Sequence, residues 1–228
     1  MRKLDKDIWI FDGEAVPFLG LPFTTRMTVV RLESGSLWIH SPIKLTDELR
    51  AEIEELGSVK YLIAPNHLHH LFIEDWQHAY PEAQSHATIE LIEKRGDLTF
   101  THALTSEAQQ PWRNDIQETL FTGSPLMEEC VFFHKPSETL IVTDLIENFA
   151  CHQLNAWQRL VAKLVGTLAP NGKMPIDWRW SFMFGRKIAR DKLSVIDGWQ
   201  PKRIVMAHGE IIERDAGNFL GKSFKWLR

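Results

Sequence analysis

Three histidines within four residues are the most chemically distinctive feature of this sequence. They are His67, His69 and His70. An apolar run, 61–64, precedes them, and a Pro-Asn pair, 65–66, separates the run from the histidines. The run is typical of a strand buried on both faces, and Pro and Asn are typical of the turn that ends one. Because neutral imidazole is the commonest protein metal ligand, we predict a metal or catalytic site here. The alternative is structural, with the rings capping the next helix and bonding to backbone.

Two further ligand-type side chains follow predicted strands. Asp144 ends the run 139–144, and His208 directly follows the run 203–207. Open α/β folds place their sites outside the carboxyl ends of strands, and a divalent ion needs ligands from separate elements. We therefore predict that the histidines, Asp144 and His208 form the ligand pool for zinc, iron or manganese. Asp144 would bridge the ion or orient a metal-bound water; taken alone, it is better explained as a helix N-cap.

Four further residues are candidates for substrate binding. Asn66 lies beside the histidines, and His40 ends the predicted strand 37–40, where a structural role is the stronger interpretation. The stretch 177–187 alternates aromatic and basic residues, including Trp178 and Arg179. It is typical of core packing, of a lid over an anionic substrate, or of a surface for a membrane or partner.

The elements that must position these residues follow from hydrophobic periodicity and turn signals. Thr46 and Gly57 have the types expected at the start and end of a helix. The two clearest hairpins and the alternation of strands with helices indicate an α/β fold. The predicted strands cover 27–33, 37–40, 59–64, 83–87, 116–121, 130–134, 139–144 and 203–207; the predicted helices cover 46–56, 73–80, 88–95, 154–168, 188–199 and 216–227.

Composition limits the class of protein. Lys and Arg number 26 and Asp and Glu 30, so the net charge of −4 gives no global basic footprint for nucleic acid. We find no secretory signal and no run long enough to span a membrane. Cys130 and Cys151 fit reduced thiols in a cytoplasmic protein. With no linker or repeat, we expect one domain over 1–228, acting on a small molecule of unknown identity; the oligomeric state stays open.

The order of these motifs resembles the metallo-β-lactamase superfamily. In that family, H-x-H-x-D-H follows a strand, a G-H-T loop comes next, and later strands end in G-D and G-H. The corresponding segments here are 64–72 (A-P-N-H-L-H-H-L-F), 142–144 (V-T-D) and 206–209 (M-A-H-G). More narrowly, P-N-x-x-H-H-L-F resembles the uncharacterised DUF4336 branch. The resemblance implies an αββα four-layer sandwich of two mixed sheets flanked by helices.

The motif departs from the two-zinc pattern of the hydrolases. If His67 and His69 take the first two positions, Leu71 and Phe72 stand where the family has Asp and the third His. The segment that should hold G-H-T, 123–129, contains no histidine; Glu128 or, as we prefer, Glu129 would supply a carboxylate instead.

Three functions are compatible with these residues. The first is a metal-dependent hydrolase that uses a metal-activated water. The second is a degenerate member without metal or catalysis, which binds a small molecule or a partner through the same cleft. The third is a mononuclear iron site with redox chemistry, which the same ligand types permit.

Overall fold

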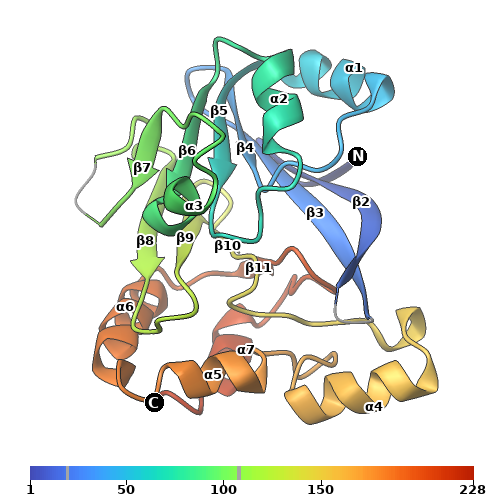
Figure 1. Ribbon diagram of the computed structural model, residues 1–228, viewed down its shortest axis with the longest axis vertical. Helices are drawn as coiled ribbons and strands as arrows, with labels where there is room; N and C mark the ends of the chain where they lie inside the picture. Colours follow the sequence, from blue (N-terminus) through green and yellow to red (C-terminus); the bar gives the residue numbers. More distant parts are fainter. Residues whose placement is uncertain (19–20, 107–108) are drawn as a thin grey trace.

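The computed structural model describes residues 1–18, 21–106 and 109–228, and it contains two mixed β-sheets (Figure 1). The larger sheet has seven strands in sequence order. Its first four strands pair antiparallel, and the remaining strands continue from β4 in parallel. These strands are β1 (Arg2–Asp5), β2 (Ile8–Phe18), β3 (Leu21–Arg31), β4 (Ser36–His40), β5 (Ser58–Ala64), β6 (Gln84–Thr88) and β7 (His102–Leu104).

The smaller sheet has the strand order β11-β10-β9-β8. The pairs β8–β9 and β9–β10 are antiparallel, whereas β10 and β11 run parallel with Ile141 opposite Val205. This parallel pair brings two segments that are distant in sequence to the same sheet edge. The strands are β8 (Ile116–Phe121), β9 (Glu129–His134), β10 (Thr139–Ile141) and β11 (Arg203–Val205).

Helices cover the outer face of each sheet, so the molecule has four layers (Figure 1). Apolar side chains fill the three spaces between layers. One core packs Leu62 under Trp76, a second packs Trp38 against Phe132 between the sheets, and a third includes Leu140. The helices are α1 (Asp47–Leu56), α2 (Ile73–Ala79), α3 (Ile89–Lys94), α4 (Ala156–Val165), α5 (Ile176–Ser181), α6 (Arg186–Gly198) and α7 (Ala216–Ser223), with a 3₁₀ turn at Cys151–Gln153.

The predicted fold class is confirmed: two mixed sheets are flanked by helices. The Thr46 side chain accepts a hydrogen bond from the Leu49 amide, as expected of the cap of α1. Helix α4 is shorter than predicted, because Gly166 adopts a left-handed conformation and ends it before the Pro-Asn-Gly sequence. Within the described residues, no helix has the length and apolarity needed to cross a membrane.

Some elements were not predicted, and two strands, β10 and β11, are shorter than expected. The sheet begins with β1 and β2, where the sequence predicts no strand. The stretch 177–187 overlaps the short helix α5 (Ile176–Ser181), which the mixture of aromatic and basic residues did not indicate, and the start of α6. Strand β10 ends at Ile141, so Asp144 lies in the loop beyond it.

Candidate metal centre

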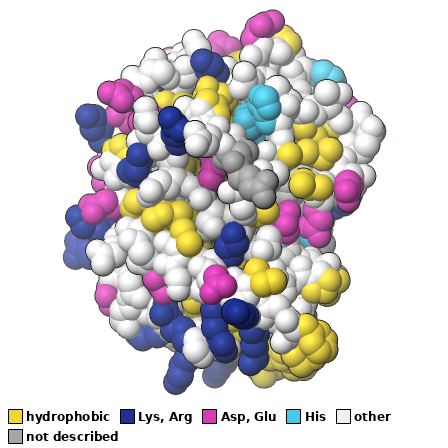
Figure 2. All heavy atoms as spheres, turned by 90° about the vertical axis from the view of Figure 1, so that its left-hand side faces the viewer, with side chains coloured by type: hydrophobic (Ala, Val, Ile, Leu, Met, Phe, Trp, Pro, Cys, Tyr) yellow, Lys and Arg dark blue, Asp and Glu magenta, His cyan; other side chains and the backbone are white. Residues whose placement is uncertain are grey.

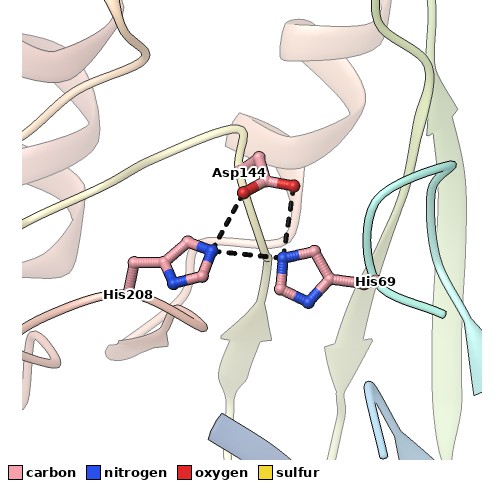
Figure 3. Close-up of side chains that lie close together, drawn as sticks. All are labelled: His69, Asp144 and His208. Atoms are coloured by element: carbon pink, nitrogen blue, oxygen red, sulfur yellow. Dashed lines mark hydrogen bonds and ion pairs between the residues drawn. The ribbon is translucent and has the colours of Figure 1, made fainter. Parts of the chain in front are cut away.

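The side chains of His69, Asp144 and His208 converge on one point (Figure 3). The Nε2 atoms of the two imidazoles lie 3.2 Å apart. His69 Nε2 is 3.2 Å from Asp144 Oδ2, and His208 Nε2 is 3.1 Å from Asp144 Oδ1. All three ligand atoms lie within 4.8 Å of one another. Two imidazole nitrogens and a carboxylate thus form a cluster that a single ion could share.

The parallel pair of strands explains why two of these residues meet. Asp144 comes three residues after Ile141, the last residue of β10, and His208 comes three residues after Val205, the last residue of β11. Ile141 and Val205 are register partners, so equal extensions beyond them reach the same place. His69 comes from the loop after β5 in the larger sheet. The centre therefore lies where the ends of the two sheets meet.

Second contacts fix the orientation of each ring. His208 Nδ1 is 2.6 Å from the carbonyl oxygen of Thr24, which can only accept, so Nδ1 carries a hydrogen. In a neutral ring, Nε2 then presents a lone pair toward the Asp144 oxygen. Two acceptors 3.1 Å apart need a proton or a cation between them. His69 Nδ1 is held 2.7 Å from Ser41 Oγ, leaving its Nε2 toward the centre. These outer contacts are of the kind that hold metal-binding histidines, so the donor set fits a divalent ion.

Asn66 links the histidine loop to the loop that carries Asp144. Its side-chain oxygen accepts hydrogen bonds from the amides of Leu68 and His69, both at 2.9 Å, which shapes the turn. Its Nδ2 donates to Asp144 Oδ2 at 2.7 Å and to Thr143 Oγ1 at 2.9 Å. Asn66 is 1% exposed. We predicted it as a substrate contact; in the structure these internal contacts occupy its side chain.

Glu129 supports the other side of the Asp144 loop. This fully buried carboxylate accepts hydrogen bonds from the backbone amides of Thr143, Asp144 and Leu145, at 2.7, 2.8 and 2.9 Å. Burial and the nearby Asp144 carboxylate raise the pKa of Glu129 above its ordinary value. The structure places Glu129 beneath the loop, outside the His69–Asp144–His208 cluster.

Opposing effects act on the charge of Asp144 itself. Burial tends to raise the pKa of this carboxyl, but the charges and hydrogen bonds of His69 and His208 outweigh it. The result is a pKa well below the ordinary value, so Asp144 is ionised at neutral pH. An ionised, nearly buried carboxylate is a suitable anionic ligand for a cation.

The other two histidines of the segment 67–70, His67 and His70, lie away from the candidate metal centre. His67 Nδ1 is 3.0 Å from Glu90 Oε2, and its ring stacks near Trp178. His70 Nδ1 is 3.1 Å from Arg95 Nη1, and burial together with nearby Lys94 and Arg95 lowers the pKa of His70 to about 4. Because the loop turns through these residues, neighbouring rings point to different surroundings, and only His69 joins the metal cluster.

His40, another residue predicted to contact substrate, is buried in the core between the sheets. Its ring stacks on Trp38 with a centroid distance of 5.4 Å and lies edge-on to Phe132. Burial, together with His69, lowers the pKa of His40 to about 3, so the ring is neutral.

A cavity of about 500 Å³ adjoins the three candidate ligands. Most of its wall is apolar. Trp178 contributes to the wall, whereas the Arg179 Nη2 donates to the carbonyl oxygen of Val165 at 3.1 Å. The apolar wall includes Val16, Phe23, Leu71, Val161, Ile176 and Trp178.

Three residues around the centre were missed by sequence reasoning. Thr24 acts through its backbone, and no side-chain pattern marks such a contact. Ser41 directly follows His40, the last residue of β4, and its position after a strand end is the one sequence feature that could have indicated it. Glu147 lines the cavity at 6% exposure; burial, reinforced by Asp144, raises its pKa well above the ordinary value.

Comparison with known proteins identifies both a family and a fold. The model of the domain of unknown function DUF4336 matches residues 5–158. The DIM-1 metallo-β-lactamase has a TM-score of 0.65 at 14% identity, covering 99% of this chain and 94% of that one. Metallo-β-lactamases from Pontibacter korlensis and Hirschia baltica give TM-scores of 0.64 and 0.62 at 12% and 14% identity. Each of these comparisons covers 99% of this chain and 96% of the other. No curated protein matches the sequence.

Proposed function

Because the chain belongs to the DUF4336 family and has the fold of the metallo-β-lactamases, we propose that it is a metal-dependent hydrolase. One divalent ion would be held by His69, Asp144 and His208. The observation that carries this proposal is the convergence of their three ligand atoms within 4.8 Å. Two histidines and one carboxylate, with a position left for water, are a ligand set used by catalytic zinc. Zinc is therefore our first choice of ion.

The bound ion would supply a Lewis acid and lower the pKa of a coordinated water. The contributions of the protein are orientation and proton transfer. Thr24 and Ser41 hold the two rings, and Asn66 holds one oxygen of Asp144. Glu147 is a carboxyl in the cavity wall whose pKa burial and Asp144 raise well above the ordinary value, which favours its protonated form. We assign it the donation of a proton to the leaving group of the substrate.

The cavity lining indicates what kind of substrate fits. Apolar side chains dominate the wall, and the acidic residues are Asp144, Glu147 and Asp177. Among the described residues of the wall, the one Lys or Arg is Lys94, whose Nζ already donates to the carbonyl oxygen of His67 at 2.7 Å. Arg179, our candidate for binding an anion, donates to a backbone carbonyl instead. A small molecule with a neutral, largely apolar body suits this cavity better than a multiply charged anion.

Two other functions are each favoured by one observation. A pair of histidines with one carboxylate also holds mononuclear iron(II), which would support redox chemistry. Alternatively, the direct contacts at 3.1–3.2 Å close the cluster on itself, as expected of a degenerate member that binds without an ion. Manganese would serve the hydrolytic role in place of zinc.

Metal analysis of the full chain, purified without a histidine tag, tests these functions. We expect about one zinc per chain and hydrolysis of a neutral 4-nitrophenyl ester that disappears on metal removal and returns with zinc. His69→Ala and His208→Ala should each lose most of the metal, because either variant leaves only two ligands. His70→Ala is the matched control, from the same loop but outside the cluster. Iron instead of zinc would favour redox chemistry, and no metal after reconstitution would favour the binding protein.

A further inference from the structure

The helices along one end of the molecule carry large hydrophobic side chains that face solvent. Phe184 is 95% exposed, Trp180 72% and Trp157 70%. A Trp or Phe this exposed is unusual, and several together mark an interaction surface. We call this surface the basic-aromatic face; its apolar members are Trp157, Leu160, Leu164, Trp180, Met183, Phe184 and Ile188.

These residues lie on three helices at one end of the molecule. Helices α4, α5 and α6 lie at the lower edge of the molecule (Figure 1). The hydrogen bond from Arg179 of α5 to Val165 of α4 joins the first two helices, and a short turn joins α5 to α6. The exposed residues Trp157, Leu160 and Leu164 have the spacing of one side of α4.

The same region concentrates positive charge. Residues 148–190 contain seven Lys or Arg and one Asp, a net charge of +6, in a chain whose total is −4. Arg159, Lys163, Arg186 and Lys187 are exposed on α4 and α6 among the apolar residues. Figure 2 shows Lys and Arg side chains gathered at the lower end, with hydrophobic side chains beside them. The low total charge thus conceals a strong asymmetry.

We propose that the basic-aromatic face binds the surface of an anionic lipid membrane. Protruding Trp and Phe side chains flanked by Lys and Arg suit a bilayer interface, where the rings enter the headgroup region and the cations meet lipid phosphates. Lys and Arg stems also cover apolar surface while their charged ends stay in water.

Charge distinguishes the membrane from a second copy of this chain. A two-fold interface would place the face against itself and bring two sets of cations together, which repel one another. An acidic protein partner would meet the same charges, but side chains that stand out as far as Phe184 suit a deformable surface.

Co-sedimentation of the full chain with vesicles tests the proposal. We expect binding to phosphatidylcholine vesicles that contain phosphatidylglycerol, weaker binding to phosphatidylcholine alone, and a loss of binding at high salt. Trp180→Ala combined with Phe184→Ala should weaken partitioning about tenfold or more. Arg186→Glu combined with Lys187→Glu should weaken it at least about 25-fold, since each cation near an anionic surface contributes about fivefold.

Matched controls use exposed residues outside this face. Ile89→Ala on α3 removes an exposed apolar residue, and Lys44→Glu with Lys60→Glu reverses two exposed cations. Both controls should bind vesicles like the natural chain, and thermal unfolding checks that every variant folds. The proposal is overturned if the natural chain does not bind anionic vesicles, or if the variants of the basic-aromatic face bind as strongly as the controls. Self-association that Phe184→Ala abolishes, without vesicle binding, would identify a dimer interface instead. Specific capture of an acidic protein, without vesicle binding, would identify a protein-binding surface.

Discussion

Replacing Glu129 by alanine separates two roles for this residue, support of the Asp144 loop and direct metal binding. The structure shows its carboxylate accepting hydrogen bonds from three buried backbone amides, of Thr143, Asp144 and Leu145. In Glu129→Ala those three donors lose their acceptor. If Glu129 were only a metal ligand, the substitution would leave the free energy of unfolding of the metal-free protein unchanged.

The magnitude follows from the number of amides left without an acceptor. Each buried donor without a partner costs about 1–3 kcal/mol, so three would cost about 3–9 kcal/mol. Removing a carboxylate beside Asp144 relieves repulsion, and its pKa is already raised by that neighbour and by burial. We therefore expect a net loss near the lower end of this range, about 4 kcal/mol. That is a large part of the 5–15 kcal/mol that stabilises a typical domain.

Urea unfolding of the metal-free protein measures this loss through tryptophan fluorescence. We expect a clearly lower midpoint for Glu129→Ala, a smaller shift for Glu129→Gln, which keeps one acceptor oxygen, and weaker zinc binding for both. Glu128→Ala is the control, because the neighbouring carboxylate is only partly buried. It should change stability by no more than about 0.5 kcal/mol. An unchanged midpoint for metal-free Glu129→Ala, together with lost metal, would refute the supporting role and make Glu129 a ligand.

Three further predictions concern other buried groups. Burial raises the pKa of Glu118 to about 7, although the hydrogen bond from Trp112 lowers it. The contribution of Glu118 to the stability of the folded protein is therefore fully present below pH 4.5 and is lost as the pH rises through 7. Relative to the natural chain, the free energy of unfolding of Glu118→Gln should be about 2 kcal/mol higher at pH 8 than at pH 5, after allowance for the partial exposure of Glu118. An equal difference between variant and natural chain at both pH values would contradict this. Gly209→Ala should lose about 3 kcal/mol and weaken metal binding, because φ is +91° and the added Cβ would lie 2.0 Å from the Asn148 carbonyl oxygen; native stability by calorimetry would contradict it. Glu147→Gln should lower kcat about 100-fold for a substrate with a poor leaving group and little for a 4-nitrophenyl ester, with metal content unchanged; equal losses on both would exclude proton donation.

The sequence predicted the elements whose signals are local. The cap at Thr46 and the hairpin around Gly35 depend on residues that are neighbours in the chain, and the structure has both. The predicted end of α4 at residue 168 was wrong, because an earlier glycine, Gly166, already provides the left-handed residue. Strand β2 lacked a matching local signal, and its pairing with β3 is seen only in three dimensions.

The candidate site could be predicted as a pool of residues but not as a geometry. Strand ends identified Asp144 and His208, since ligand-type residues after buried strands are readable. Choosing His69 over its two neighbours was beyond the sequence, because the loop after β5 is irregular and has no period that fixes where each ring points. The Asn66 side chain makes that choice by accepting the amide hydrogens of residues 68 and 69. Such a contact competes with regular structure and leaves no pattern of hydrophobicity.

The arrangement around Asp144 is difficult to explain by stability alone. Three acidic side chains, Glu129, Asp144 and Glu147, are at most 6% exposed, and the charge of Asp144 raises the pKa of the other two. Burying neighbouring carboxylates costs stability unless positive charge offsets it, and apolar residues of similar size would pack there without that cost. Among the described residues in contact with Asp144, only the two histidine rings can carry positive charge, and when the His208 ring is neutral its Thr24 contact leaves a lone pair facing the Asp144 carboxylate. A divalent ion at this point would satisfy that lone pair and the carboxylate together. Folding stability alone does not favour such a cluster, whereas the metal site proposed above would offset its cost.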